Sequence, residues 1–142
     1  MNEMTATLNL VLAFLLGGGI GFFREKERKA AGMRTHILVC LGSALLMVLS
    51  AKMMQLSPGA DPGRLAAGIA TGIGFIGAGC IVQTGSGVRG ITTAASIWVT
   101  SAIGIAAGAG FYIEAVVTGI LSIATLQGIR FFETRYFKTK DE

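Results

Sequence analysis

Residues 21–36 read GFFREKERKAAGMRTH, and this charged segment separates two long apolar stretches. It contains five of the twelve Lys and Arg residues of the chain and the only histidine, His36. The stretch before it, Thr5 to Phe23, carries no charge, and neither does the stretch Ile37 to Ala51 after it. A helix needs roughly 17–25 mostly apolar residues to cross the hydrocarbon core of a bilayer. The segment therefore marks the loop between two membrane helices.

The composition of the whole chain excludes a soluble domain. Hydrophobic residues make up 52% and charged residues 14%, where soluble proteins carry about 25% charged residues. Further uncharged blocks cover Leu65–Val88, Gly90–Ile113 and Ala115–Ile129. We therefore expect an all-α, polytopic membrane protein, folded as a compact, glycine-rich bundle of five transmembrane helices. This transmembrane domain would span residues 1–132, followed by a short basic cytoplasmic tail, residues 133–142.

The distribution of basic residues predicts how the bundle lies in the membrane. If the loop after the first helix is cytoplasmic, ten of the twelve Lys and Arg residues lie on that side, and only Lys52 and Arg64 lie opposite. Basic residues concentrate on the cytoplasmic side of membrane proteins, so we expect the N-terminus outside and the C-terminus in the cytoplasm. Anionic lipid headgroups account for the net charge of +4, and no nucleic-acid partner is needed.

Glycine is abundant, at 21 of 142 residues, and three pairs follow the GxxxG pattern. Small residues let helix backbones approach closely in lipid. Two interpretations stay open: the glycines close a tight bundle, or they leave the third helix thin, bent or broken beside a cavity or a dimer interface. The glycines concerned are Gly17, Gly21, Gly68, Gly72, Gly74, Gly77, Gly79, Gly104 and Gly108.

No arrangement of residues indicates an enzyme or a dedicated metal site. A single histidine excludes a multi-histidine metal site within one chain, and we expect no cofactor. Asp61-Pro62 predicts a helix start, with Arg64 placed to pair with Asp61. A weak exterior cation site is the alternative there, since Mg²⁺ prefers oxygen ligands and Asp61 and Glu114 are the only candidates.

A polar cluster is expected at the cytoplasmic face, where Arg24 and Glu25 leave the first helix and His36 begins the second. One interpretation is a hydrogen-bonded network that pins the first loop to the loop before the fourth helix. The other is a patch that recognises an anion, a ligand or a partner, with His36 adding pH sensitivity. The cluster comprises Arg24, Glu25, Arg34, Thr35, His36 and Arg89, and we expect it to converge on Arg89.

Three longer motifs follow one another within residues 17–112. The first is Gly21-x-x-Arg24-Glu25 with residues 31–36, AGMRTH. The second is residues 64–67, RLAA, with residues 72–79, GIGFIGAG, and the third is residues 88–95, VRGITTAA, with Trp98. Together these motifs resemble the MgtC/SapB family of bacterial inner-membrane proteins. Two features differ from the pattern of that family: Gly68 stands where a polar residue is expected, and we expect a short form without the ACT-like cytoplasmic domain.

The resemblance implies a multi-pass inner-membrane protein linked to growth in low magnesium, acid tolerance and, in pathogens, survival inside macrophages. It favours a non-enzymatic regulator that binds other membrane proteins, such as the ATP synthase or P-type Mg²⁺ ATPases. One alternative is a small channel or transporter for Mg²⁺ or another cation, formed by a homodimer. A second alternative is a membrane sensor of pH or of an anionic ligand.

The predicted orientation can be tested by cysteine labelling in intact cells. We expect Asn2→Cys to react with a membrane-impermeant maleimide added from outside, and Thr139→Cys to react only after the membrane is permeabilised. Labelling of Thr139→Cys in intact cells would show that the orientation is reversed.

Overall fold

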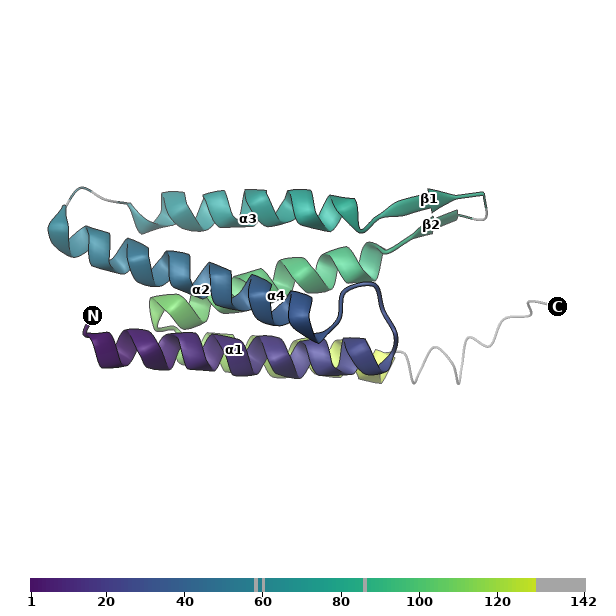
Figure 1. Cartoon of the computed structure of the whole chain (residues 1–142), viewed down its shortest axis with the longest axis horizontal. Coiled ribbons are helices and arrows are strands. Elements are labelled where there is room, and N and C mark those ends of the chain that lie inside the picture. Colours follow the sequence, from purple (N-terminus) through teal and green to yellow (C-terminus); the bar gives the residue numbers. More distant parts are fainter. Residues whose placement is uncertain (58, 60, 86, 130–142) are drawn as a thin grey trace.

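The computed structural model of the chain describes residues 1–57, 59, 61–85 and 87–129. It contains five α-helices and a two-stranded antiparallel hairpin between the third and fourth helices (Figure 1). The last helix continues into a π-helical segment, η1. The elements are α1 (Glu3–Lys26), α2 (Met33–Leu56), α3 (Pro62–Gly79), β1 (Val82–Thr84), β2 (Gly87–Arg89), α4 (Ile91–Ala109), α5 (Tyr112–Ala124) and η1 (Thr125–Ile129).

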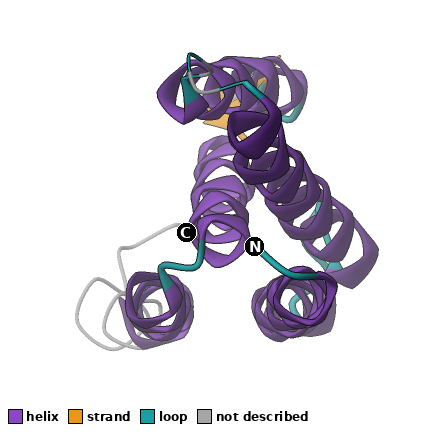
Figure 2. Cartoon of the chain, turned by 90° about the vertical axis from the view of Figure 1, so that its left-hand side faces the viewer, coloured by secondary structure: helices purple, strands orange, loops and turns teal. Residues whose placement is uncertain are grey.

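Helix α4 lies at the centre of the bundle and packs against each of the other four helices (Figure 2). Helix α3 lies at one edge, against α4 and, less extensively, α2. Only Ile69 and Gly77 of its residues are buried, whereas α4 buries nine residues. The core therefore belongs to α1, α2, α4 and α5, and α3 is attached to its outside.

Four helical segments are long and apolar enough to cross a membrane within the described part of the chain: α1, α2, α4, and α5 with η1. Large apolar side chains such as Leu8, Leu38 and Leu121 are exposed on the outside of the bundle, as expected for a surface in contact with lipid. The prediction of a multi-pass, five-helix membrane protein is confirmed to this extent. That α3 is a fifth span, and the orientation of the bundle, stay predictions. The basic tail, residues 133–142, lies outside the described residues.

The third apolar block differs from the expected single helix. Helix α3 is continuous but ends at Gly79, and strands β1 and β2 follow it as an antiparallel pair, with Val82 opposite Arg89 and Thr84 opposite Gly87. Glycines lower helix propensity, and β-branched residues favour strands. The sequence after Gly79 contains glycine and β-branched residues, so the helix ends before the uncharged block does.

Two of the GxxxG pairs lie where helix backbones touch. A Cβ atom added to Gly17 of α1 would lie 2.7 Å from the carbonyl oxygen of His36 and 2.8 Å from Cβ of Cys40, both on α2. Gly21 meets Met33 of α2 in the same way. On α4, a Cβ atom added to Gly104 would overlap a backbone carbonyl of α2, and so would one added to Gly108. Helix α2 is therefore held between α1 and α4 at distances that only glycine permits.

The glycines of α3 have different surroundings. A Cβ atom added to Gly68, Gly72, Gly74 or Gly79 would meet no atom within 4 Å among the described residues. Gly77 faces Ala94 of α4 at an ordinary contact distance of 3.6 Å, and Gly63, in the first turn, faces the capping side chain of Asp61 at 3.1 Å. These open positions contribute little to the packing of the bundle itself.

Alanine substitutions should separate the two kinds of glycine. We expect Gly104→Ala to lower the free energy of unfolding by about 1–3 kcal/mol, because the added methyl group overpacks the contact with α2. Gly72→Ala should leave it unchanged or raise it by up to about 1 kcal/mol, since a helical glycine is replaced where space is free. Thermal unfolding in detergent measures both. An equal loss in both variants would contradict this assignment.

Candidate functional site

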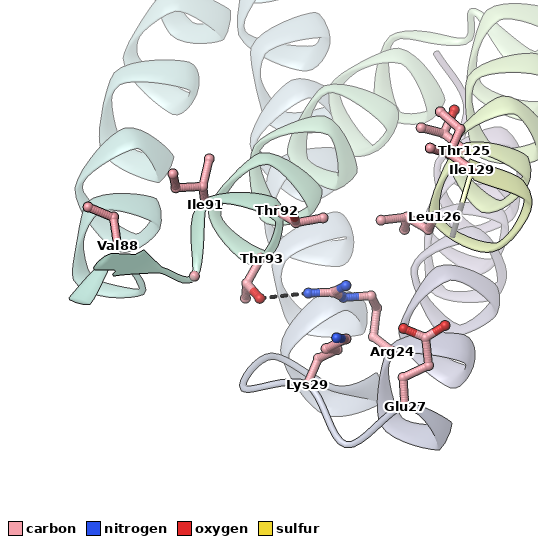
Figure 3. A pocket seen from close by; sticks show the side chains of 11 residues that line it. Arg24, Glu27, Lys29, Val88, Ile91, Thr92, Thr93, Thr125, Leu126 and Ile129 are labelled. Carbon is pink, nitrogen blue, oxygen red and sulfur yellow. Dashed lines mark hydrogen bonds between the residues drawn. The ribbon is translucent and has the colours of Figure 1, made fainter. Parts of the chain in front are cut away.

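Arg24, in the last turn of α1, is buried with 2% of its surface exposed. Its Nη2 donates a hydrogen bond of 2.6 Å to Oγ1 of Thr93, in the first turn of α4 (Figure 3). Gly21, one turn before Arg24, is the residue that brings α1 against the start of α2. The close helix contact therefore carries the arginine side chain into the junction of α1, α2 and α4.

His36, in the first turn of α2, is fully buried at the same junction. Its Nδ1 lies 2.8 Å from the carbonyl oxygen of Gly32, and its Nε2 lies 3.1 Å from Oγ of Ser96. Because a carbonyl oxygen only accepts, Nδ1 carries a hydrogen. The Ser96 hydroxyl lies 2.8 Å from the carbonyl oxygen of Thr93, so its single hydrogen goes either there or to Nε2. When the hydroxyl hydrogen points to Nε2, the neutral ring is satisfied at both nitrogens, so His36 links the start of α2 to α4 as a neutral side chain.

Glu25 contacts the backbone at the start of α2. Its Oε2 accepts a hydrogen bond of 2.8 Å from the backbone N–H of Met33, the first residue of that helix. A carboxylate at a helix N-terminus satisfies a free N–H group and interacts favourably with the helix dipole. Glu25 therefore fixes the loop 27–32 to the helix that follows it.

The structure brings together only part of the expected polar cluster. Arg24 and His36 are buried at the junction, and Glu25 is exposed beside it at the start of α2, whereas Arg34 is exposed and Thr35 is half-buried. Arg89 is also exposed, since it belongs to strand β2 and pairs with Val82. The expected convergence on Arg89 is therefore replaced by contacts to α4, because the hairpin carries Arg89 away from the bundle.

Sequence reasoning missed the residues of α4 that complete the junction. Thr93, Ser96 and Thr100 are buried and recur at helical spacing, so they form a polar stripe along one face of α4. Asn9 of α1 was missed as well. It is fully buried at the other end of the bundle, where its amide donates to the carbonyl oxygen of Gly108 at 3.1 Å and accepts from the Tyr112 hydroxyl at 2.8 Å. These positions could have been found in the sequence, because they are polar residues within otherwise apolar blocks.

A cavity of about 640 Å³ opens beside Arg24, between the end of α1, the start of α4 and η1 (Figure 3). Basic, acidic and hydroxyl side chains line it together with a few apolar ones. The lining residues are Arg24, Glu27, Lys29, Val88, Gly90, Ile91, Thr92, Thr93, Thr125, Leu126 and Ile129.

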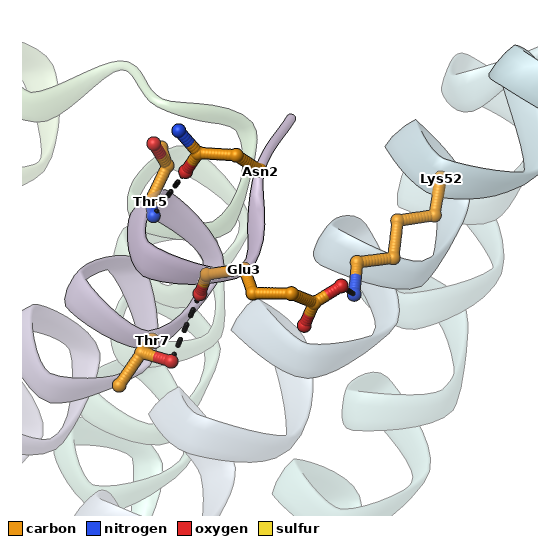
Figure 4. Close-up of polar contacts among 5 residues, drawn as sticks. All are labelled: Asn2, Glu3, Thr5, Thr7 and Lys52. Carbon is orange, nitrogen blue, oxygen red and sulfur yellow. Dashed lines mark hydrogen bonds and ion pairs between the residues drawn. The ribbon is translucent and has the colours of Figure 1, made fainter.

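The expected exterior site has the geometry of a helix cap. Oδ1 of Asp61 accepts a hydrogen bond of 2.8 Å from the N–H of Gly63, and Asp61 is the N-cap of α3. No ion pair joins it to Arg64; within the described ranges, the ion pair formed is Lys52 with Glu3, at 2.8 Å between α2 and α1 (Figure 4). Among the described residues, no three His, Cys, Asp or Glu side chains are grouped so as to hold a metal ion.

A sequence model of the MgtC family matches residues 10–135. The chain belongs to the MgtC family. It is 42% identical over 125 residues to "Putative magnesium transporter YhiD" of Escherichia coli (strain K12), which covers 84% of this chain and 58% of the relative. The family relationship suggested by the motifs is thereby confirmed.

Two further relatives carry the name of the family. "Protein MgtC" of Brucella abortus is 46% identical over 112 residues, which cover 79% of this chain and 46% of the relative. "Protein MgtC" of Salmonella typhimurium is 44% identical over 114 residues, with 80% and 48% covered. The chain thus spans about half the length of the curated relatives it matches. No solved structure matches it.

The contact between Arg24 and Thr93 should contribute measurably to stability. We expect Thr93→Val to lower the free energy of unfolding by about 1–3 kcal/mol, because it removes the acceptor of a buried, charged donor. Thr93→Ser keeps the hydroxyl and should retain most of the stability. Thermal unfolding of the two variants in the same detergent compares them. Equal stability of Thr93→Val and Thr93→Ser would show that the hydrogen bond contributes little.

Proposed function

We propose that this protein is a non-enzymatic regulator of the bacterial inner membrane, used in adaptation to low magnesium or acid, that acts by binding another membrane protein along α3. Membership of the MgtC family and the magnesium-related name of the relative from Escherichia coli support a role in magnesium physiology. The relatives are named as MgtC proteins or as a transporter, and not as enzymes.

The open face of α3 is the observation that carries the proposal. Gly68, Gly72, Phe75 and Gly79 follow one another at spacings of four, three and four residues, so they share one side of the helix. The glycines have free space around them, and Phe75 is 85% exposed. Where the bundle does use GxxxG pairs, on α1 and α4, each pair lies against a neighbouring helix.

Free glycines on a membrane helix favour contact with another helix. Lipid provides no hydrophobic drive for association, so helices in a bilayer pair where small residues let their backbones approach. A helix face with Gly68 and Gly72 offers such an approach, and the neighbouring Phe75 can fill a groove of the partner. As partner we propose an ion-motive ATPase of the same membrane, either the ATP synthase or a P-type Mg²⁺ ATPase.

The second candidate is a homodimeric transporter of Mg²⁺ or another cation, and the name of the relative YhiD, a putative magnesium transporter, favours it. A second copy of the chain would then cover the open face of α3. A cavity of about 480 Å³ lies between α2 and α3, but apolar side chains dominate its lining, among them Leu38, Leu46 and Ile73. Mg²⁺ requires oxygen ligands or its own water shell, so this cavity supports the regulator better than the transporter.

Site-specific photocross-linking tests the regulator. We expect p-benzoylphenylalanine at position 75 to cross-link, in cells starved of magnesium, to a subunit of the ATP synthase or to the P-type Mg²⁺ ATPase, identified by specific antibodies. The same probe at Leu121, which is 60% exposed on α5, is the matched control and should give no such product. Adding Gly72→Leu should abolish the product, because the bulky side chain keeps the partner helix away, while Gly128→Leu, at an open glycine of η1, should not.

The same experiment separates the two candidates. Equal cross-linking to an ATPase from positions 75 and 121 would contradict a docking face on α3. A product between two copies of the chain, together with Mg²⁺ flux in liposomes that contain only this protein, would favour the homodimeric transporter instead.

A further inference from the structure

We propose that the cavity beside Arg24 binds a phosphoryl group, carried either by an anionic phospholipid or by a soluble phosphate. The cavity lies where the end of α1, the start of α4 and η1 meet. This inference goes beyond the docking function of α3 and does not rest on it, because the two regions share no residue.

Arg24 supplies a buried positive charge that its protein neighbours leave incompletely satisfied. The side chain is 2% exposed, and within the described residues it donates a hydrogen bond to the neutral hydroxyl of Thr93. Its Nε is buried and has no hydrogen-bond partner in the part of the chain that the structure describes. The carboxylate of Glu27 attracts the guanidinium group electrostatically, but these two described residues form no ion pair at hydrogen-bonding distance. A buried charge is costly unless an opposite charge or further hydrogen bonds compensate it. The planar guanidinium group is suited to contact two oxygens of one phosphate.

Helix α4 directs its N-terminus into the same cavity. Among the described residues, no side chain caps this helix, whose N-cap is Gly90 with a φ of 92°; α2, with Gly32 as its N-cap, also lacks one, whereas Asn2 caps α1 and Asp61 caps α3. The first N–H groups of a helix and its dipole form a favourable site for an anion. Thr92 and Thr93, in the first turn, also line the cavity. The uncapped end lies against the end of α3, because a Cβ atom on Gly90 would overlap the carbonyl group of Cys80, the C-cap of that helix.

The remaining charges place the anion on the α4 side of the cavity. Lys29, which is exposed at the rim, adds a second cation. Glu27 adds a negative charge, but one of its oxygens accepts a hydrogen bond of 2.8 Å from Nε2 of Gln127 in η1. Figure 3 shows Arg24 between Glu27 and Thr93, with its guanidinium group directed toward α4. An anion between Arg24, Lys29 and the start of α4 is therefore separated from the carboxylate.

The donor set favours a phosphoryl group. Two cations, free N–H groups and two hydroxyls converge from different directions, which matches an oxyanion with several acceptor oxygens. Ile91, Leu126 and Ile129 form apolar walls beside these donors. Such walls fit the glycerol and upper acyl chains of a phospholipid, and they leave room for a small soluble phosphate.

The test uses the full chain purified in an uncharged maltoside detergent. In one arm, thermal unfolding is followed with inorganic phosphate, against chloride at equal ionic strength. In the other arm, native mass spectrometry measures retention of phosphatidylglycerol, against zwitterionic phosphatidylcholine. A bound ligand raises the unfolding temperature because it binds the folded state alone. Stabilisation by inorganic phosphate would identify a soluble source, and selective retention of phosphatidylglycerol alone would identify a lipid source.

Three variants test the residues. Arg24→Gln and Lys29→Gln remove the two cations of the cavity, and Lys26→Gln removes an exposed cation of the same helix end that does not line it. We expect Arg24→Gln to weaken binding by about tenfold, as for the loss of one charge-assisted hydrogen bond. Lys29→Gln should weaken it less, by roughly threefold, since an exposed charge is screened by solvent. Lys26→Gln should leave it unchanged.

The proposal is overturned if neither phosphate nor phosphatidylglycerol binds, or if Lys26→Gln weakens binding as much as Lys29→Gln does. The second result would mean that general surface charge attracts the anion. If Arg24→Gln does not fold, the comparison of Lys29→Gln with Lys26→Gln decides the question, since both side chains are exposed.

Discussion

The close contact of α2 with α1 and α4 is the constraint on which the rest of the structure depends. Gly17 and Gly21 bring α1 to α2, and the pair Gly104 and Gly108 brings α4 to the same helix. In a bilayer, dispersion and hydrogen bonding hold helices together, and both require short distances. The glycines provide those distances, so the core of three helices is set by the absence of side chains at four positions.

Close packing of the helices also explains how polar residues can be buried here. His36 and Arg24 reach Ser96 and Thr93 of α4 only because the backbones are near enough for direct hydrogen bonds. A polar group in the hydrocarbon region without a partner is costly, so these residues and the glycines depend on each other. Asn9 repeats the arrangement at the opposite end, bound to α4 and to the start of α5. Polar contacts and close glycine contacts therefore occur together at both ends of the bundle, since Gly21 lies beside Arg24 and Gly108 accepts the hydrogen bond from Asn9.

The two functional proposals concern regions where the packing or hydrogen bonding of the bundle is incomplete. Among the residues that the structure describes, four glycines of α3 have no atom against them, and Arg24 has a buried nitrogen with no acceptor. Each observation concerns a contact that the isolated chain does not make. A partner helix would complete the first and an anion the second, and the two sites lie on different elements, so each can be occupied without the other.

The sequence by itself determined the class of protein, the family and the number of helices, because uncharged blocks, basic loops and ordered motifs can be read without knowledge of contacts. It also located the charged segment 21–36 and the residues Arg24, Glu25 and His36. Only the tertiary structure showed which glycines contact a neighbouring helix, since the GxxxG pattern in the sequence is the same in α3 as in α1. It also decided that Thr93 and Ser96, and not Arg89, meet the cluster. The reason is geometric: the hairpin after Gly79 moves Arg89 out of the bundle, and the packing of α4 on α2 places its hydroxyl stripe in the core.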